Sequence, residues 1–394
     1  MTNASTAAGE IRLTGITLRE IRLPLKEPFR ISSGVVDTRR IVLLTLRDAD
    51  GVEVWSECVA EALPNYTAET VDTCWLAIAE YAAPRVLGQS FAGPGDVPAA
   101  LERDFRGHQM AKAAVEMGAW GLAAERAGVP LARVVAGARP VRDAIETGIS
   151  LGIQPSPAAL VERAAAALAE GYRKVKLKVS PGRDVAYVRA VREALGPGAP
   201  LMADANNAYA LDDPAHVAAL EALDAFGLMM IEQPLAWDDL VRHARLQARL
   251  RTPLCLDESI TSADRAEDMI ALGAGRIVNV KPGRVGGFAQ AVAVHDVCAA
   301  AGVPVWCGGM LESGVGRAYN VALAALPNFS KPGDLSPSAR YWAQDVVAPE
   351  WTMDAEGRVR VPLDRTGIGV RVDVDRIDDL TVRRLALGEG AGQG

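Results

Sequence analysis

The sequence is short of lysine and cysteine. Of its 42 basic residues, only 7 are lysine and 35 are arginine. Arginine holds its proton above about pH 12 and cannot act as a base, so each lysine is a candidate for chemistry that arginine cannot perform. The 5 cysteines are scattered and form no C-x-x-C pair. This pattern argues against a disulfide framework and favours a reducing compartment.

Long hydrophobic runs are also missing. No run approaches the ~18 apolar residues of a membrane-spanning helix, and residues 1–30 lack the basic and then apolar segments of an export signal. We therefore expect a cytoplasmic protein with no membrane partner. The net charge of −7 argues against a nucleic-acid partner. With 394 residues, 49% of them hydrophobic, the chain has room for a large core and more than one domain.

The chain changes pattern at about residue 140. Before that point, strand-like segments at 11–25 and 39–58, the second with a hairpin turn at Asp50-Gly51, precede helical segments at 67–88 and 108–128. Strands followed by helices indicate an α+β unit. After it, short apolar runs alternate with alanine-rich helical stretches.

A charged residue stands near the end of five successive apolar runs: Lys178, Asp204, Glu232, Asp257 and Lys281. The intervals are 26, 28, 25 and 24 residues, which is the length of one strand, one helix and two short loops. Such a series of βα units, without a glycine-rich phosphate-binding sequence after its first strand, predicts a TIM-type barrel. Barrel enzymes carry their chemistry at the carboxyl ends of the strands, where these five residues fall.

Three lysines lie close together in the first of these runs. Residues two apart in a strand share a face and lie about 6.6 Å apart, so Lys176 and Lys178 share a face that a parallel barrel buries. We expect burial and mutual repulsion to lower both pKa values, so that a lysine can accept a proton. The alternative is a basic edge strand that faces water, and we assign Lys174, at the strand entrance, to that alternative.

Three carboxylates should converge at the barrel mouth. Asp204, Glu232 and Asp257 end consecutive strands, and three such groups cannot all stay ionised without a cation. An all-oxygen ligand set favours Mg2+ first and Mn2+ next, and the positions of the four histidines in helical or loop segments argue against zinc. The alternative for any one carboxylate is a helix cap, and Asp257 suits that role well.

A second lysine is expected on the far side of the cation. Strands two and six of a barrel face each other, so Lys281 should lie across the mouth from Lys178. One lysine could then remove a proton from a metal-bound carboxylate compound, and the other could return it to the opposite face. Arg284 would lower the pKa of Lys281 by like-charge repulsion, and a loop salt bridge is its equal alternative.

These residues resemble the enolase superfamily and, within it, the muconate-lactonising subgroup. The motifs KLKV, DANNAY, IEQPL, CLDES, VNVKPGRVGG and GGMLESGVGRA are similar to those of the o-succinylbenzoate synthase / N-acylamino acid racemase (N-succinylamino acid racemase) family. The likeness covers nearly the whole chain. It implies an α/β fold with a modified (β/α)7β barrel over residues 136–355. An α+β capping domain would span residues 1–135 and be completed by the tail, residues 356–394.

The resemblance also implies roles for individual residues. Asp204, Glu232 and Asp257 would bind Mg2+, Lys178 and Lys281 would be the acid/base pair, and cap loops 30–34 and 65–66 would close over the substrate. Lys176 would polarise the substrate carboxylate. Further substrate-binding positions would be Ser150, Asn206, Gly309, Met310, Tyr66 and Glu312. A small carboxylate substrate and a homo-oligomer are expected.

The activity that the resemblance implies is o-succinylbenzoate synthesis in the menaquinone pathway, with N-succinylamino acid racemisation at the same site. A dipeptide epimerase or a muconate-type cycloisomerase is the alternative among enzymes. A mandelate-type racemase is disfavoured because it uses a histidine base where this chain has Lys281. A barrel kept only for binding would have no need to retain three carboxylates and two lysines.

Overall fold

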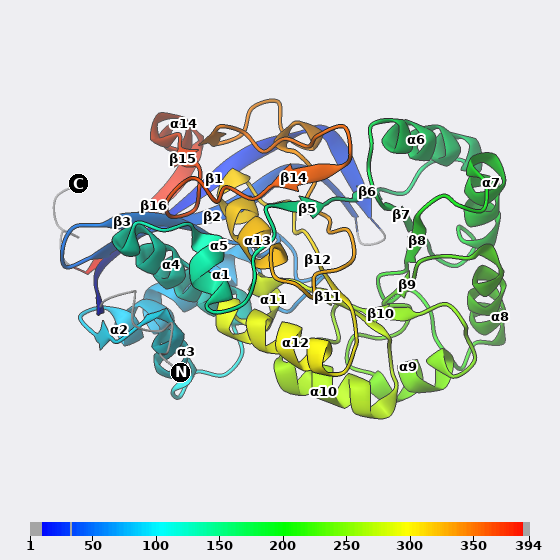
Figure 1. Ribbon diagram of the computed structural model, residues 1–394, viewed down its shortest axis with the longest axis horizontal. Helices are drawn as coiled ribbons and strands as arrows, with labels where there is room; N and C mark the ends of the chain where they lie inside the picture. Colours follow the sequence, from blue (N-terminus) through cyan, green and yellow to red (C-terminus); the bar gives the residue numbers. More distant parts are fainter. Residues whose placement is uncertain (1–9, 32–33, 389–394) are drawn as a thin grey trace.

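Two kinds of sheet organise the chain, which a computed structural model describes over residues 10–31 and 34–388 (Figure 1). A unit of antiparallel strands and helices, blue to cyan, lies beside a barrel of parallel strands ringed by helices, green to yellow. The last strand returns to the first unit. The expected fold, a (β/α)7β barrel with an α+β cap, is confirmed.

The first unit is built on an antiparallel sheet. Its strands are β1 (Ile11–Ile31), β2 (Gly34–Asp48), β3 (Glu53–Cys58) and β16 (Thr381–Gly388), in the order β16-β1-β2-β3, and β4 (Ser90–Phe91) pairs with β1. The predicted hairpin turn joins β2 to β3. The Asp48 carboxylate accepts hydrogen bonds from the backbone of Asp50 (3.0 Å) and Val52 (2.8 Å). Gly51 takes a positive φ of 82° there, which costs glycine little.

The helices of this unit include both predicted segments. The first becomes α1 (Val71–Ala77), a π-helical turn η2 (Ile78–Ala82) and α2 (Ala83–Val86), and the second becomes α4 (Gln109–Ala127), ended by Gly128 in the left-handed conformation. The other helices that precede the barrel are η3 (Pro94–Asp96), α3 (Val97–Glu102) and α5 (Leu131–Ala136). Helix α4 packs against β2 and β3 on one side and against α11 of the barrel on the other. It therefore joins the two units.

The barrel sheet runs in chain order with parallel pairing. Its strands are β6 (Ile149–Leu151), β7 (Val175–Lys178), β8 (Leu201–Asp204), β9 (Ile231–Glu232), β10 (Leu254–Leu256), β11 (Ile277–Val280) and β12 (Val305–Cys307). The helices between and after them are α6 (Pro157–Ala169), α7 (Val185–Leu195), α8 (Pro214–Leu223), η4 (Asp224–Phe226), α9 (Leu240–Gln247), α10 (Ala263–Leu272), α11 (Pro282–Val285), α12 (Phe288–Ala300) and α13 (Gly314–Ala324).

The chain after α13 closes the ring between β12 and β6. The backbone N–H of Asp334 donates to the carbonyl of Cys307 (2.9 Å), and the N–H of Gly148 donates to the carbonyl of Gly333 (2.6 Å). Residues 333–334 thus stand in the place of an eighth strand. This short closing segment brings a carboxylate, Asp334, to the mouth of the barrel.

Alternation along β7 shows why the sequence forms a barrel strand. Val175 and Leu177 are fully buried in the apolar cluster that the outer helices share, while the ammonium group of Lys176 lies 5.2 Å from the Trp306 ring inside the barrel. The neighbouring helices begin at polar caps, such as Ser156 for α6. These caps set where the loops before α6 and α7 end.

The tail beyond α13 is divided between the two units. Helix α14 (Val374–Leu380) and β16 belong to the first unit, since residues 15–21 of β1 pair with residues 381–388. The strand-like segment before them pairs elsewhere: β14 (Arg358–Arg360) with β5 (Ala144–Glu146), and β15 (Arg371–Val372) with β13 (Val347–Ala348). A short helix, η5 (Ser338–Arg340), follows the closing segment.

All five cysteines are buried free thiols. Within the described ranges, none of the helices is both long and apolar enough to cross a lipid bilayer.

Candidate active site

The five charged residues at the strand ends meet at the mouth of the barrel. Lys178, Asp204 and Glu232 are the last residues of β7, β8 and β9, and Asp257 and Lys281 directly follow β10 and β11. The sheet register places Lys178 opposite Asp204, and Asp204 opposite Glu232. The convergence that the regular spacing predicted is therefore present.

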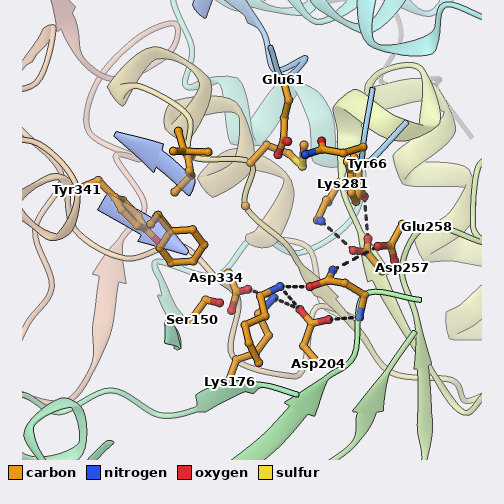
Figure 2. Close-up of a pocket in the computed structure, with 18 of the residues that line it drawn as sticks. Glu61, Tyr66, Ser150, Lys176, Asp204, Asp257, Glu258, Lys281, Asp334 and Tyr341 are labelled. Atoms are coloured by element: carbon orange, nitrogen blue, oxygen red, sulfur yellow. Dashed lines mark hydrogen bonds and ion pairs between the residues drawn. The ribbon is translucent and has the colours of Figure 1, made fainter. Parts of the chain in front are cut away.

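A cavity of about 140 Å3 lies at this mouth, between the barrel and the first unit. Its lining includes most of the predicted site residues: Lys176, Lys178, Asp204, Asp257, Lys281, Ser150, Asn206, Gly309, Met310 and Tyr66. Figure 2 shows Tyr66 and Lys281 on one side of the cavity, and Lys176, Asp204 and Ser150 on the other. Both units thus contribute to one enclosed site.

The lysines of β7 pair with the carboxylates of the next two strands. The Nζ atom of Lys178 lies 2.6 Å from Asp204 Oδ2 and also donates to the amide oxygen of Asn206. The Nζ atom of Lys176 lies 3.3 Å from both Asp204 Oδ2 and Glu232 Oε2. Lys176 is thus held between two of the three candidate metal ligands.

The expected lowering of the Lys176 pKa is wrong. Burial lowers this pKa, but the charges of Asp334, Glu232 and Asp204 outweigh burial and hold it well above its usual value. Three carboxylates around one ammonium group favour its charged form. The Lys176 ammonium is therefore suited to binding an anion.

Lys281, the second lysine of the predicted acid/base pair, belongs to a compact cluster on the Tyr66 side of the cavity. The Nζ atom of Lys281 lies 2.9 Å from Asp257 Oδ2 and 4.2 Å from the centre of the Tyr66 ring. The Tyr66 hydroxyl donates to Asp257 Oδ1 (2.9 Å) and accepts from Arg284 Nη1 (3.0 Å). Burial lowers the pKa of Lys281, but Asp257 and Tyr66 raise it to a net value above the usual one.

Both predicted roles of Arg284 have a basis in this cluster. Its guanidinium forms an ion pair with Asp257 and donates to the backbone carbonyls of Ile260 (2.7 Å) and Asn279 (2.6 Å). Its charge also acts to lower the pKa of Lys281, although weakly beside the charge of Asp257. Arg284 therefore fixes Asp257 and tunes Lys281 from the same position.

The three strand-end carboxylates are suited to a hard cation. Burial, and after it the like charge of Asp204, raise the pKa of Glu232 to about 8. In residues 10–31 and 34–388, no three His, Cys, Asp or Glu side chains are arranged to hold a metal. Lysine ammonium groups lie against oxygens of all three carboxylates. The set of buried oxygens on neighbouring strands still matches the ligands that Mg2+ or Mn2+ prefers.

The predicted substrate-binding residues fall into two groups. Ser150 lines the cavity, and its buried hydroxyl has no hydrogen-bond partner in the described part of the chain. Glu312 lies outside the lining, where it accepts from the backbone N–H of Met310 (2.7 Å) and from Asn320 (2.7 Å). Glu312 thus supports the loop that holds Met310. Of the predicted cap loop 30–34, Ser32 and Ser33 lie outside the described residues.

The prediction that Lys174 faces water is wrong. Its side chain is fully buried inside the barrel, with Nζ 3.5 Å from the centre of the Trp306 ring and 3.0 Å from Asp334 Oδ1. Asp334 is itself a cavity residue that sequence reasoning missed. It lies 53 positions beyond Lys281, about two further intervals of the βα spacing, so a longer count along the chain would have found it.

A further missed carboxylate is Glu258, which also lines the cavity. It accepts hydrogen bonds from the side-chain amides of Asn206 (3.3 Å) and Asn207 (3.2 Å). Burial and the neighbouring charge of Asp257 raise the pKa of Glu258 to about 7. Asn65, from the predicted cap loop 65–66, also lines the cavity, and the remaining missed lining residues are Phe29, Val36, Glu61, Asn207, Leu311, Arg317 and Tyr341.

The fold and the site define a class of enzyme: a capped barrel with carboxylates and lysines at the carboxyl ends of its strands. Residues 159–376 match the family described as enolase C-terminal domain-like, and residues 13–135 match the mandelate racemase / muconate lactonizing enzyme N-terminal domain. The chain belongs to this family within the enolase superfamily, as its motifs predicted.

Curated relatives span almost the whole chain. The o-succinylbenzoate synthase of Geobacillus kaustophilus is 47% identical over 371 residues, which cover 94% of this chain and 96% of the relative. The N-succinylamino acid racemase of Thermus thermophilus is 47% identical over 373 residues, covering 94% and 98%. A solved enolase superfamily member from Listeria innocua has a TM-score of 0.90 and 36% identity, covering 96% of this chain and 99% of its own.

Proposed function

We propose that this enzyme converts 2-succinyl-6-hydroxy-2,4-cyclohexadiene-1-carboxylate to o-succinylbenzoate and also racemises N-succinylamino acids. The observation that carries the proposal is the placement of two lysines, Lys178 and Lys281, in one carboxylate-rich cavity, each paired with a different strand-end carboxylate. Relatives at 43–47% identity bear both activities in their names. The two reactions share one demand, removal of a proton next to a carboxylate.

The first task of the site is to hold the substrate carboxylate. Lys176, whose ammonium stays charged among its carboxylate neighbours, and the unpaired hydroxyl of Ser150 would bind it. Asp204, Glu232 and Asp257 would hold a divalent cation, Mg2+ or alternatively Mn2+, whose charge stabilises negative charge developing on the substrate. Fixed positive charge of this kind is usually the largest contribution to such a reaction.

The second task is proton transfer. For dehydration, Lys178 takes the proton α to the carboxylate and then donates it to the ring hydroxyl on the same face, so that the hydroxyl leaves as water and the ring becomes aromatic. Lys281 stays cationic on the other side and stabilises the intermediate. For racemisation, one lysine takes the α-proton and the other delivers a proton to the opposite face, so the two exchange roles between enantiomers.

The third task is exclusion of water. Phe29 and Tyr66 from the first unit and Tyr341 from the barrel side line the same cavity as the lysines. Closing a site in this way strengthens the electrostatic interactions inside it. The first unit thus acts as the lid of the barrel, and its side chains would contact the part of the substrate away from the reacting carbon.

Assays of both activities on one preparation of the enzyme test the proposal. With Mg2+ we expect o-succinylbenzoate to form, followed by its ultraviolet absorbance, and N-succinyl-L-phenylalanine to lose optical rotation. Both activities should disappear with excess EDTA and return with added Mg2+. Turnover of a dipeptide or of muconate, with neither proposed substrate converted, would refute the proposal in favour of an epimerase or a cycloisomerase.

A further inference from the structure

The site contains a buried ion pair that the mechanism above does not use. Lys174 and Asp334 lie 3.0 Å apart, and both side chains are buried. The chain makes room for this lysine at Gly148, where an added Cβ would lie 2.7 Å from Cε of Lys174. Two buried charges are costly even when paired.

Asp334 reaches Lys176 with its second carboxylate oxygen. Asp334 Oδ2 lies 2.5 Å from Lys176 Nζ, closer than Asp204 or Glu232, which are each 3.3 Å away. Figure 2 shows Asp334 beside the end of the Lys176 side chain, at the edge of the cavity. Each carboxylate oxygen of Asp334 thus contacts a different lysine ammonium.

The other two neighbours of Lys176 have a competing task. The proposed function gives Asp204 and Glu232 to the divalent cation, which would draw their oxygens away from Lys176. Of these three carboxylates, only Asp334 would then remain in contact with the Lys176 ammonium while the cation is bound. Lys174 pairs with that carboxylate from inside the barrel. The centre of the Trp306 ring lies 3.5 Å from Lys174 Nζ, so the ring packs against the ammonium group.

We propose that Asp334 and Lys174 are positioning residues that act through Lys176: Lys174 fixes Asp334, and Asp334 fixes the ammonium group that meets the substrate carboxylate. This inference rests on the proposed function, because that function assigns Lys176 to the substrate. A misplacement of about 1 Å in a catalytic group can reduce turnover on the order of 100-fold. Loss of either residue should therefore change kinetics as well as stability.

The chain offers a matched control for Lys174. Lys112 in α4 is also buried, lies 2.8 Å from a carboxylate (Glu102) and 4.7 Å from the centre of an aromatic ring (Phe105), and lies outside the cavity lining. Lys174→Met and Lys112→Met should both lower the melting temperature. We expect kcat/KM for N-succinyl-L-phenylalanine to fall about tenfold in Lys174→Met, through both kcat and KM, and to stay within twofold of the parent in Lys112→Met.

A double-mutant cycle tests whether Lys174 acts through Asp334. We expect Asp334→Asn to lower kcat/KM about 100-fold while its Mg2+ dissociation constant, measured by calorimetry, stays within twofold of the parent. The double variant Lys174→Met/Asp334→Asn should have the same kcat/KM as Asp334→Asn alone, because Lys174 then has no Asp334 carboxylate left to position. If the kcat/KM of the double variant instead falls about 1,000-fold, the product of the two single losses, the residues act independently and the proposal is overturned.

Two further outcomes would also overturn it. One is a Lys174→Met enzyme with the same kcat and KM per folded molecule as Lys112→Met. The other comes from crystal structures of the parent and Lys174→Met: we expect the Lys176 ammonium to leave its parental position, and an unmoved ammonium contradicts the proposal. If the parent converts neither substrate, the proposed function fails, and this structural comparison alone decides the positioning role.

Discussion

The hydroxyl of Tyr66, a residue of the first unit, donates a 2.9 Å hydrogen bond to Asp257 at the barrel mouth. The same ring lies 4.2 Å from the ammonium nitrogen of Lys281. One side chain of the capping unit therefore contacts both a candidate metal ligand and a candidate base. The position of the capping unit and the arrangement of the catalytic groups are thereby linked.

Replacing Tyr66 with phenylalanine tests this link. The change removes a hydrogen bond to a charged group, typically worth about 1.5–3 kcal/mol, and leaves Arg284 without its tyrosine acceptor. We expect kcat/KM to fall about tenfold or more, measured by steady-state racemisation. Tyr319→Phe is the matched control, because Tyr319 is buried and donates to the Trp55 carbonyl (2.8 Å) away from the cavity. Equal kinetic losses in the two variants would contradict a specific role for Tyr66.

Asp204→Asn tests the candidate metal site. Asn keeps the shape of the side chain but removes the charge, so Mg2+ affinity should fall more than tenfold in calorimetry. Asp213→Asn changes an exposed helix cap of α8 and provides the control. If Asp204→Asn binds Mg2+ as the parent does, Asp204 is not a ligand.

Acid should destabilise the fold through His243. Burial lowers the pKa of His243 below its usual value, and its Nε2 accepts the backbone N–H of Leu235 (3.2 Å), which only the neutral ring can do. The folded state thus disfavours protonation, so this contribution to stability is present above about pH 6.5 and is lost as the pH falls below it.

Urea unfolding at pH 7.5 and 5.5 measures this effect. We expect the parent to lose more unfolding free energy between these pH values than His243→Asn does. The difference should be on the order of the 1–3 kcal/mol that an unsatisfied buried group costs. The same pH dependence in both proteins would contradict the assignment.

The sequence predicted the fold and the main site because both follow from local periodicity. The 24–28-residue spacing of Lys178, Asp204, Glu232, Asp257 and Lys281 places them at successive strand ends, and parallel strands present those ends on one rim. The period-2 alternation of β7 likewise placed Lys176 inside the barrel. These features need only the regular geometry of strands and helices.

The errors arose where distant segments decide the environment. Alternation alone places Lys174 on the inner face with Lys176, but its burial depends on Trp306 and Asp334, which lie more than a hundred residues away. The raised pKa of Lys176 depends on the same carboxylate. Glu312 accepts the backbone N–H of Met310 and lies outside the cavity lining, and the intervening Leu311 takes a positive φ of 55°, a loop conformation that the motif does not reveal.

Exchange of the substrate α-proton in 2H2O tests the two-lysine account most directly. The parent should exchange the α-proton of both enantiomers of N-succinylphenylalanine and racemise them. Lys178→Ala and Lys281→Ala should each lose racemisation, by at least the 100-fold typical of general acid–base catalysis, and each should retain exchange for at most one enantiomer, the opposite one in each variant. Lys331→Ala, outside the cavity, should behave as the parent. Racemisation that survives in either variant at close to the parental rate, or exchange of the same enantiomer by both, would contradict it.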